Sequence, residues 1–166
     1  FSIICGTMTT VHGYTGDQRP VDQIHKNPAR GRAAAANIIP TSTGAAKAIG
    51  KAIPALAGIM DGMALRVPVP DGSVVDLVAE CERDATVEAV NAAMKEAAEG
   101  ELKGIMKYSD EPLVSSDCVG DPHSAIFCAV NTIVVSKKLV KVIALYDNEW
   151  GYSNRVVDLM DKAAAL

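Results

Sequence analysis

Apolar and polar residues follow two different periods along this chain, and these periods predict where strands and helices lie. Residues 2–11 are rich in Ile, Thr and Val, which predicts a strand that ends at His12. Within residues 86–98, apolar residues repeat at the spacing of one helix face, and Gly100 is placed to end the helix. The helix is therefore predicted to serve the core rather than the chemistry.

Other segments complete the list of expected elements. Ser42 or Thr43 can cap a helix that continues to Pro54, and residues 151–164 are predicted to form the last helix. The remaining apolar segments are predicted to be strands: 63–69, 73–81, 105–108, 113–115, 125–135 and 139–146. The first two of these are joined by a Pro-Asp-Gly turn, so we expect them to form a hairpin.

The order of these elements decides the fold class. Strands are grouped around helices without a regular alternation, which predicts an α+β fold: a mixed, largely antiparallel sheet with helices covering one face. A chain of 166 residues, of which 49% are hydrophobic, is long enough to bury one core, so residues 1–166 are interpreted as a single domain. No GxGxxG sequence occurs, so a complete dinucleotide-binding unit is not predicted.

Composition excludes several classes of function. The net charge of −4 argues against a general affinity for nucleic acid or for an anionic membrane. The four cysteines are far apart and form no CxxC pair, which predicts no metal site, no disulfide framework and a reduced, cytoplasmic setting. Neither a signal peptide nor an apolar run of about 18 residues is present, so no membrane partner is expected.

Two side chains are candidates for chemistry. His12 can act as a base near neutral pH, although a lone histidine after a strand is more often structural or solvated. Arg66 lies inside an apolar strand, where its guanidinium needs an anionic partner, either a phosphate or an internal carboxylate. Cys5 is an odd number of residues from His12, which places it on the other strand face, and it is predicted to be a small buried hydrophobe. All four thiols are interpreted as structural.

Four motifs in order carry a family resemblance. They are Thr9-Thr10-Val11-His12-Gly13-Tyr14-Thr15, Ser42-Thr43-Gly44-Ala45-Ala46-Lys47, Met63-Ala64-Leu65-Arg66-Val67-Pro68 and Tyr146-Asp147-Asn148-Glu149-Trp150-Gly151-Tyr152-Ser153-Asn154-Arg155. Together they resemble the catalytic domain of phosphorylating glyceraldehyde-3-phosphate dehydrogenase, along essentially the whole chain. The dinucleotide-binding domain and the Ser-Cys-Thr-Thr-Asn-Cys nucleophile motif of that family would precede Phe1. The chain is therefore predicted to be a fragment of a two-domain dehydrogenase.

The resemblance implies a role for individual residues. His12 is expected to be the catalytic base and the partner of the thiolate, and Arg66 and Thr15 are expected to bind the C3 phosphate of the substrate. Thr43 and Gly44 are expected to bind the attacking inorganic phosphate at a helix start. The structural alternatives are an exposed loop hydroxyl for Thr15 and an ordinary helix cap for Thr43.

Cofactor contacts follow from the last motif. Asn148 matches the asparagine that hydrogen-bonds the nicotinamide carboxamide of NAD, and Tyr146 and Tyr152 are expected to frame that pocket. A turn asparagine before a helix is the structural alternative. The other basic side chains are interpreted as loop, interface or solvent residues: Arg19, His25, Arg30, Arg32 and His123.

The resemblance implies an enzyme of glycolysis that converts glyceraldehyde 3-phosphate, NAD and inorganic phosphate to an acyl phosphate and NADH. It also implies a cytoplasmic homo-oligomer, a tetramer in the family, and an inactive protein when these residues stand alone. Two alternatives stay open at this point. One is an erythrose-4-phosphate dehydrogenase domain, and the other is a non-enzymatic oligomeric interaction module.

Overall fold

The structure is a computed structural model that describes residues 1–166, except for the side chains of Ala46 and Lys47. The strands are β1 (Ile3–Gly13), β2 (Ile39–Ser42), β3 (Met60–Val67), β4 (Ser73–Cys81), β5 (Met106–Ser109), β6 (Ala125–Cys128), β7 (Ile133–Val135) and β8 (Leu139–Tyr146). The helices are α1 (Gly44–Ala52), α2 (Val87–Glu99) and α3 (Trp150–Ala164). Short 3-10 turns are η1 (Pro28–Gly31), η2 (Ala34–Ala36), η3 (Pro54–Leu56), η4 (Ser115–Cys118) and η5 (Ala129–Asn131).

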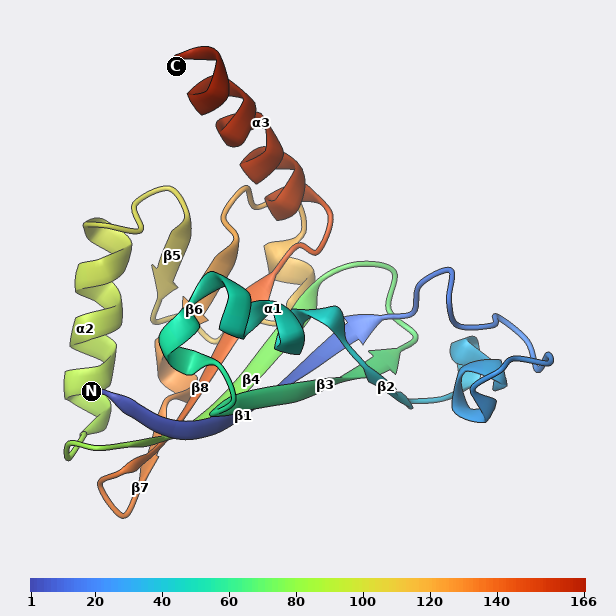
Figure 1. The fold of residues 1–166 in the computed structure, drawn as a ribbon, viewed down its shortest axis with the longest axis horizontal. Helices are drawn as coiled ribbons and strands as arrows, with labels where there is room; N and C mark the ends of the chain where they lie inside the picture. The colour runs from blue at the N-terminus through green and yellow to red at the C-terminus, as the bar shows by residue number, and fades with distance from the viewer.

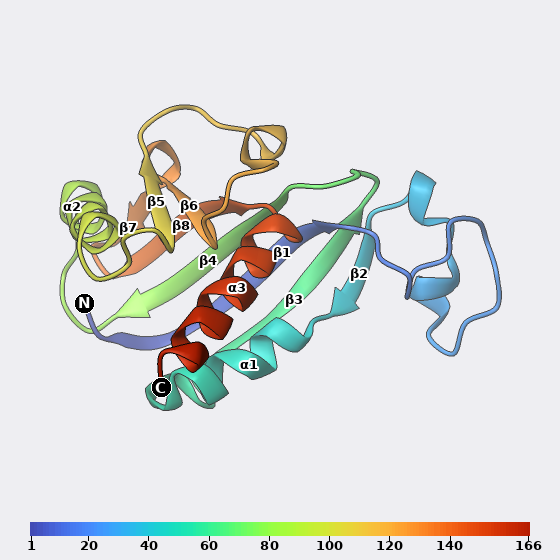
Figure 2. The same cartoon turned by 90° about the horizontal axis from the view of Figure 1, so that it is seen from above.

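The strands form one mixed sheet in the order β2-β3-β1-β4-β8-β6-β5, with β7 beside β8. The pairs β1–β3 and β5–β6 are parallel, and the other neighbouring strands are antiparallel. Figure 1 shows the helices on one side of this sheet, with α3 rising away from it, and Figure 2 shows the same arrangement from above. The predicted α+β fold is confirmed.

The core lies between α2 and the β8–β6–β5 part of the sheet. The predicted helix is present as α2, and Thr86 caps it by accepting a hydrogen bond from the Ala89 N–H. The buried face of α2 presents Val90 to Val140 and Ala98 to Phe127. A separate buried cluster lies on the opposite face, because neighbouring strand residues point to opposite sides; it consists of Cys118, Ile126, Cys128 and Leu145.

The predicted hairpin is wrong. The β3 and β4 strands do not pair with each other, because β1 lies between them, parallel to β3 and antiparallel to β4. Their connection, residues 68–72, therefore passes over the end of β1 and does not close a tight turn. Gly13 permits this crossing, since a Cβ atom there would lie 2.7 Å from the Val69 carbonyl oxygen.

Two further strand predictions also need correction. Residues 113–115 are not a strand but lead into η4, and residues 125–135 are split into β6 and β7 by the three-residue turn η5. The split is held by α2: the Asn91 amide donates to the Ala129 carbonyl, and the Thr132 hydroxyl donates to the Asn91 side-chain oxygen. The polar stretch of residues 15–40 contains η1 and η2 and leads into the edge strand β2. This strand was not predicted.

Candidate functional site

His12 and Arg66 are direct neighbours at the end of two parallel strands. They are paired in the β1–β3 register, so their side chains lie on the same face of the sheet. The Nδ1 atom of His12 lies 2.7 Å from the Gly13 carbonyl oxygen. Because a carbonyl can only accept, Nδ1 carries the proton in the neutral ring and the lone pair belongs to Nε2.

The guanidinium of Arg66 is half-buried, and its contact is a carbonyl rather than a carboxylate. Its Nη1 donates to the Gly13 oxygen at 3.4 Å, and its Nε is buried without a hydrogen-bond partner among the described residues. Burial lowers the pKa of Arg66, but an arginine keeps its charge. The structure therefore does not show the internal ion pair that was the alternative for this residue.

The electrostatics around His12 favour its neutral form. Burial of the ring lowers the pKa of His12 below 6.5, and the positive charge of Arg66 acts in the same direction. The hydrogen bond to Gly13 and the negative charge of Asp71 oppose these effects without reversing them. An imidazole that is unprotonated near neutral pH can accept a proton as a general base.

A polar cluster from β1, β4 and β8 stands next to the His12 ring. The Tyr146 hydroxyl and the Thr10 hydroxyl are 2.9 Å apart, and the Tyr146 ring lies edge-on to His12 with centroids 6.4 Å apart. The Oδ1 atom of Asn148 accepts a hydrogen bond from the Ser73 hydroxyl at 2.8 Å. Asn148 is thereby fixed with its amide N–H groups left to donate. The predicted neighbour Tyr152 is 72% exposed on α3, so it closes no pocket within the described residues.

Thr15 lies at the start of a loop that contacts the region before α1, where the second anion was expected. Two residues along this loop, Asp17 forms an ion pair with Arg30, and Arg30 Nη2 donates to the Ser42 carbonyl at 3.2 Å and to its hydroxyl at 3.3 Å. The charge of Arg30 also acts on Arg66. The sequence indicated only a loop, interface or solvent role for Arg30. Its contacts with Asp17 and Ser42 were not predicted.

Of the two residues predicted as possible caps of α1, Ser42 and Thr43, the structure shows Thr43 in this place. Its hydroxyl accepts a hydrogen bond from the Ala45 N–H at 3.2 Å, and the space around the Gly44 Cα is open. Ser42, just before the cap, pairs with Met63 on β3, whereas Arg66 lies three residues farther along the same strand. The α1 start and the Arg66 guanidinium are therefore two separate positions, and Arg30 contacts Ser42 beside the first of them.

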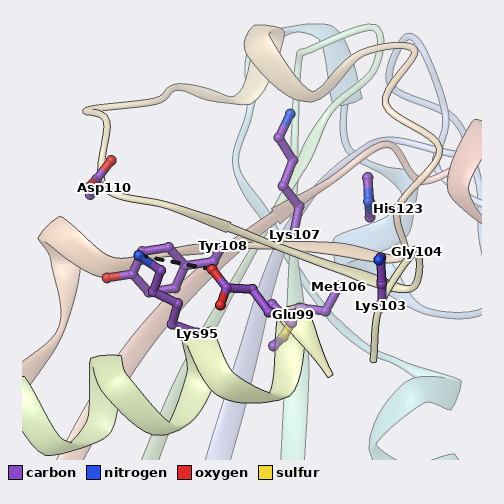
Figure 3. A pocket seen from close by; sticks show the side chains of 10 residues that line it. Lys95, Glu99, Lys103, Gly104, Met106, Lys107, Tyr108, Asp110 and His123 are labelled. Atoms are coloured by element: carbon purple, nitrogen blue, oxygen red, sulfur yellow. Dashed lines mark ion pairs between the residues drawn. The ribbon is translucent and has the colours of Figure 1, made fainter. Parts of the chain in front are cut away.

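A different concave surface lies at the opposite edge of the sheet. An open hollow of about 510 Å³ separates α2 from β5, four strands away from β1 (Figure 3). Two of its basic side chains have an acidic neighbour: Lys95 Nζ lies 4.0 Å from a Glu99 carboxylate oxygen, and His123 Nδ1 lies 2.6 Å from the Asp121 carboxylate. This hollow is separate from the His12 site.

The thiols do not lie beside His12. Cys81, Cys118 and Cys128 are buried, and burial raises the pKa of Cys118 and Cys128. Cys5 lies on the strand face opposite His12, as predicted, but it is exposed, and its Sγ is 3.8 Å from a Glu80 carboxylate oxygen. The predicted burial of Cys5 is wrong. The helices lie on the other side of the sheet (Figure 1), so none of the described helices covers the face of β1 that carries Cys5.

No group of three or more His, Cys, Asp or Glu side chains in the part of the chain that the structure describes is arranged to hold a metal ion. Among the described helices, none combines the length and the apolar character needed to cross a membrane.

Comparison with known proteins gives consistent matches. Residues 1–148 match the family described as glyceraldehyde 3-phosphate dehydrogenase, C-terminal domain. A glyceraldehyde-3-phosphate dehydrogenase of Mycobacterium avium is 61% identical over 160 residues, which cover 96% of this chain and 47% of the relative. The protein of the same name from Geobacillus stearothermophilus is 60% identical over 159 residues, with 96% and 48% covered. The chain thus spans about half the length of the curated relatives it matches.

Proposed function

Because the chain belongs to the family of the glyceraldehyde 3-phosphate dehydrogenase C-terminal domain, we propose that the protein containing it oxidises glyceraldehyde 3-phosphate. The reaction takes NAD and inorganic phosphate and yields an acyl phosphate, NADH and a proton. One observation carries the proposal: a half-buried Arg66, bonded to a carbonyl instead of a carboxylate, stands beside a neutral His12. A cation held in this way is suited to a ligand phosphate.

His12 is the proposed base. Its Nδ1 is held by the Gly13 carbonyl, so the ring cannot turn freely and Nε2 is the atom that receives a proton. Such a reaction needs a thiol that attacks the aldehyde carbon and transfers its proton to the base. We propose that this thiol comes from a part of the protein outside residues 1–166, since the thiols of the described residues lie in other surroundings.

Two phosphate positions are assigned on separate elements. Arg66 and Thr15 take the phosphate of the aldehyde, since Arg66 pairs with His12 across β1 and β3 and Thr15 lies two residues after the end of β1. Thr43 and Gly44 take inorganic phosphate, because the start of a helix favours an anion and the space beside the Gly44 Cα is open. Arg30 is added to the second position on the basis of its contacts with Ser42.

Asn148 is the proposed contact to NAD. NAD, when bound, accepts the hydride that leaves the substrate carbon. The residues fit its carboxamide, because Asn148 Oδ1 is occupied by the Ser73 hydroxyl and the amide N–H groups can donate to a carboxamide oxygen. Tyr146 fixes the neighbourhood of His12 through its contact with Thr10.

The test is an assay of the full-length protein. We expect NADH formation to require both glyceraldehyde 3-phosphate and inorganic phosphate, and a faster rate than with erythrose 4-phosphate. A faster rate with erythrose 4-phosphate would assign the domain to the alternative dehydrogenase. Failure to form NADH from either aldehyde would contradict the proposal and favour a non-enzymatic module.

We also propose a cytoplasmic homo-oligomer. The support is that the four cysteines are free thiols and that the strands expose apolar side chains such as Ile4 and Met63. Sedimentation of the purified protein at tens of micromolar concentration should give at least a dimer. A mass of one chain would contradict this part of the proposal.

A further inference from the structure

Gln18 is a buried polar residue in the loop that carries Thr15. Its side chain is only 2% exposed, although its neighbours on both sides are more accessible. The Gln18 N–H donates to the Thr15 carbonyl at 3.0 Å, which closes the turn formed by residues 15–18. The side chain then folds back onto the first residue of the same turn.

The Gln18 side-chain oxygen holds both donors of Thr15. The Oε1 atom accepts from the Thr15 N–H at 2.8 Å and from the Thr15 hydroxyl at 3.1 Å. Because a backbone N–H can only donate, the oxygen of the amide must face Thr15 and the amide cannot be reversed. The Nε2 atom is consequently buried without a partner among the described residues.

Burying the Gln18 Nε2 without a partner is unfavourable, so the contact between Gln18 and Thr15 is kept at a cost in stability. A role of this turn at the proposed phosphate positions would explain that cost. Thr15 begins the turn, and Asp17 inside it forms the ion pair with Arg30, which reaches Ser42 beside the α1 start. The Gln18 amide thus holds a turn that carries Thr15 of one proposed phosphate position and Asp17, the ion-pair partner of Arg30 in the other.

We infer that Gln18 is a positioning residue for the phosphate of the aldehyde substrate, acting through Thr15; this inference rests on the proposed function. Gln18 keeps the Thr15 backbone fixed through the N–H contact. The hydroxyl can then turn its proton from the Gln18 oxygen to a phosphate oxygen without movement of the chain. Gln18 therefore acts on substrates that carry a phosphate and not on the chemistry of the aldehyde.

The experiment compares two aldehydes in the full-length protein. With Gln18→Leu we expect kcat/KM for glyceraldehyde 3-phosphate to fall about tenfold, mainly through KM, because one oriented donor to a charged group is lost. The value for unphosphorylated glyceraldehyde should stay within about twofold. Gln23→Leu is the matched control, since Gln23 is an exposed glutamine of the same loop, and it should change neither value.

A second variant guards against a folding defect of Gln18→Leu. Thr15 is exposed, so Thr15→Val should fold, and it must show the same selective loss if Gln18 acts through the Thr15 hydroxyl. The inference would be overturned if kcat/KM fell equally for both aldehydes, or if neither variant lost its preference for the phosphorylated one. The proposed function would then still stand on the activity of the wild-type protein. A wild-type protein inactive on glyceraldehyde 3-phosphate would overturn both.

Discussion

The two ends of the sheet place a histidine and a neighbouring basic side chain against different partners. At the β5 edge, Lys107 and His123 both contact the Asp121 carboxylate, at 3.0 and 2.6 Å. At the β1–β3 end, His12 and Arg66 share one backbone carbonyl instead. A half-buried cation without a carboxylate keeps its electrostatic attraction for a ligand, whereas a neutralised one does not. The comparison therefore supports our proposal that an anion binds at the β1–β3 end.

The largest effect on activity is expected when residues 1–166 are assayed alone. The isolated chain should form no NADH, because hydride transfer needs a bound nicotinamide and the chemistry needs a thiol beside His12. The measurement is phosphate-dependent NADH production by the purified chain. Production that survives Cys5→Ser, which removes the exposed thiol, would require another nucleophile among the buried cysteines.

The next effect separates the two histidines in the full-length protein. His12→Asn should lower kcat about 10²- to 10⁴-fold with little change in KM, because it removes the proton acceptor. His123→Asn, which alters a histidine already paired with Asp121, should leave kcat within about twofold. A similar loss in both variants would show that the comparison between the sheet ends is wrong.

A smaller effect separates the two cations. Arg66→Ala should raise KM for glyceraldehyde 3-phosphate about 10- to 100-fold, with a lesser effect on kcat, because a charged contact to phosphate is lost. Lys107→Ala, at the neutralised end, should leave KM unchanged. If Arg66→Ala instead lowered kcat and spared KM, the guanidinium would act on the reaction and not on substrate binding.

The sequence could predict features that depend on neighbouring residues. Helix α2 was expected from its apolar spacing, and α1 from a cap at Ser42 or Thr43, because periodicity and capping act within a few residues. Placing His12 at a strand end required no tertiary contact either. Its pairing with Arg66 could be expected only from the resemblance.

Features that depend on distant pairing could not be predicted. The Pro-Asp-Gly turn indicates a hairpin, but nothing local reveals that β1 enters between β3 and β4. The burial of Cys5 was predicted from its apolar neighbours, whereas the uncovered sheet face decides its exposure. Arg30 gains its place from contacts with Asp17 and Ser42, which lie 13 and 12 residues away. The available signal was the presence of opposite charges, Asp17 and Arg30, within the polar residues 15–40.

The smallest effect concerns the protonation of His12 and tests the comparison most directly. The pKa of His12 is lowered from 6.5 by burial and by Arg66, so the unfolded chain binds more protons than the folded chain as the pH falls below 6.5. Stability should therefore decrease with falling pH through the folded-state pKa. Arg66→Met keeps much of the side-chain bulk but removes the charge, and it should raise the pKa of His12 and reduce this loss of stability. NMR titration of the His12 ring in the chain measures the shift, and Lys107→Met serves as the control that removes a charge four strands away. An unchanged pKa in Arg66→Met, or an equal rise in Lys107→Met, would show that Arg66 does not set the charge of the proposed base.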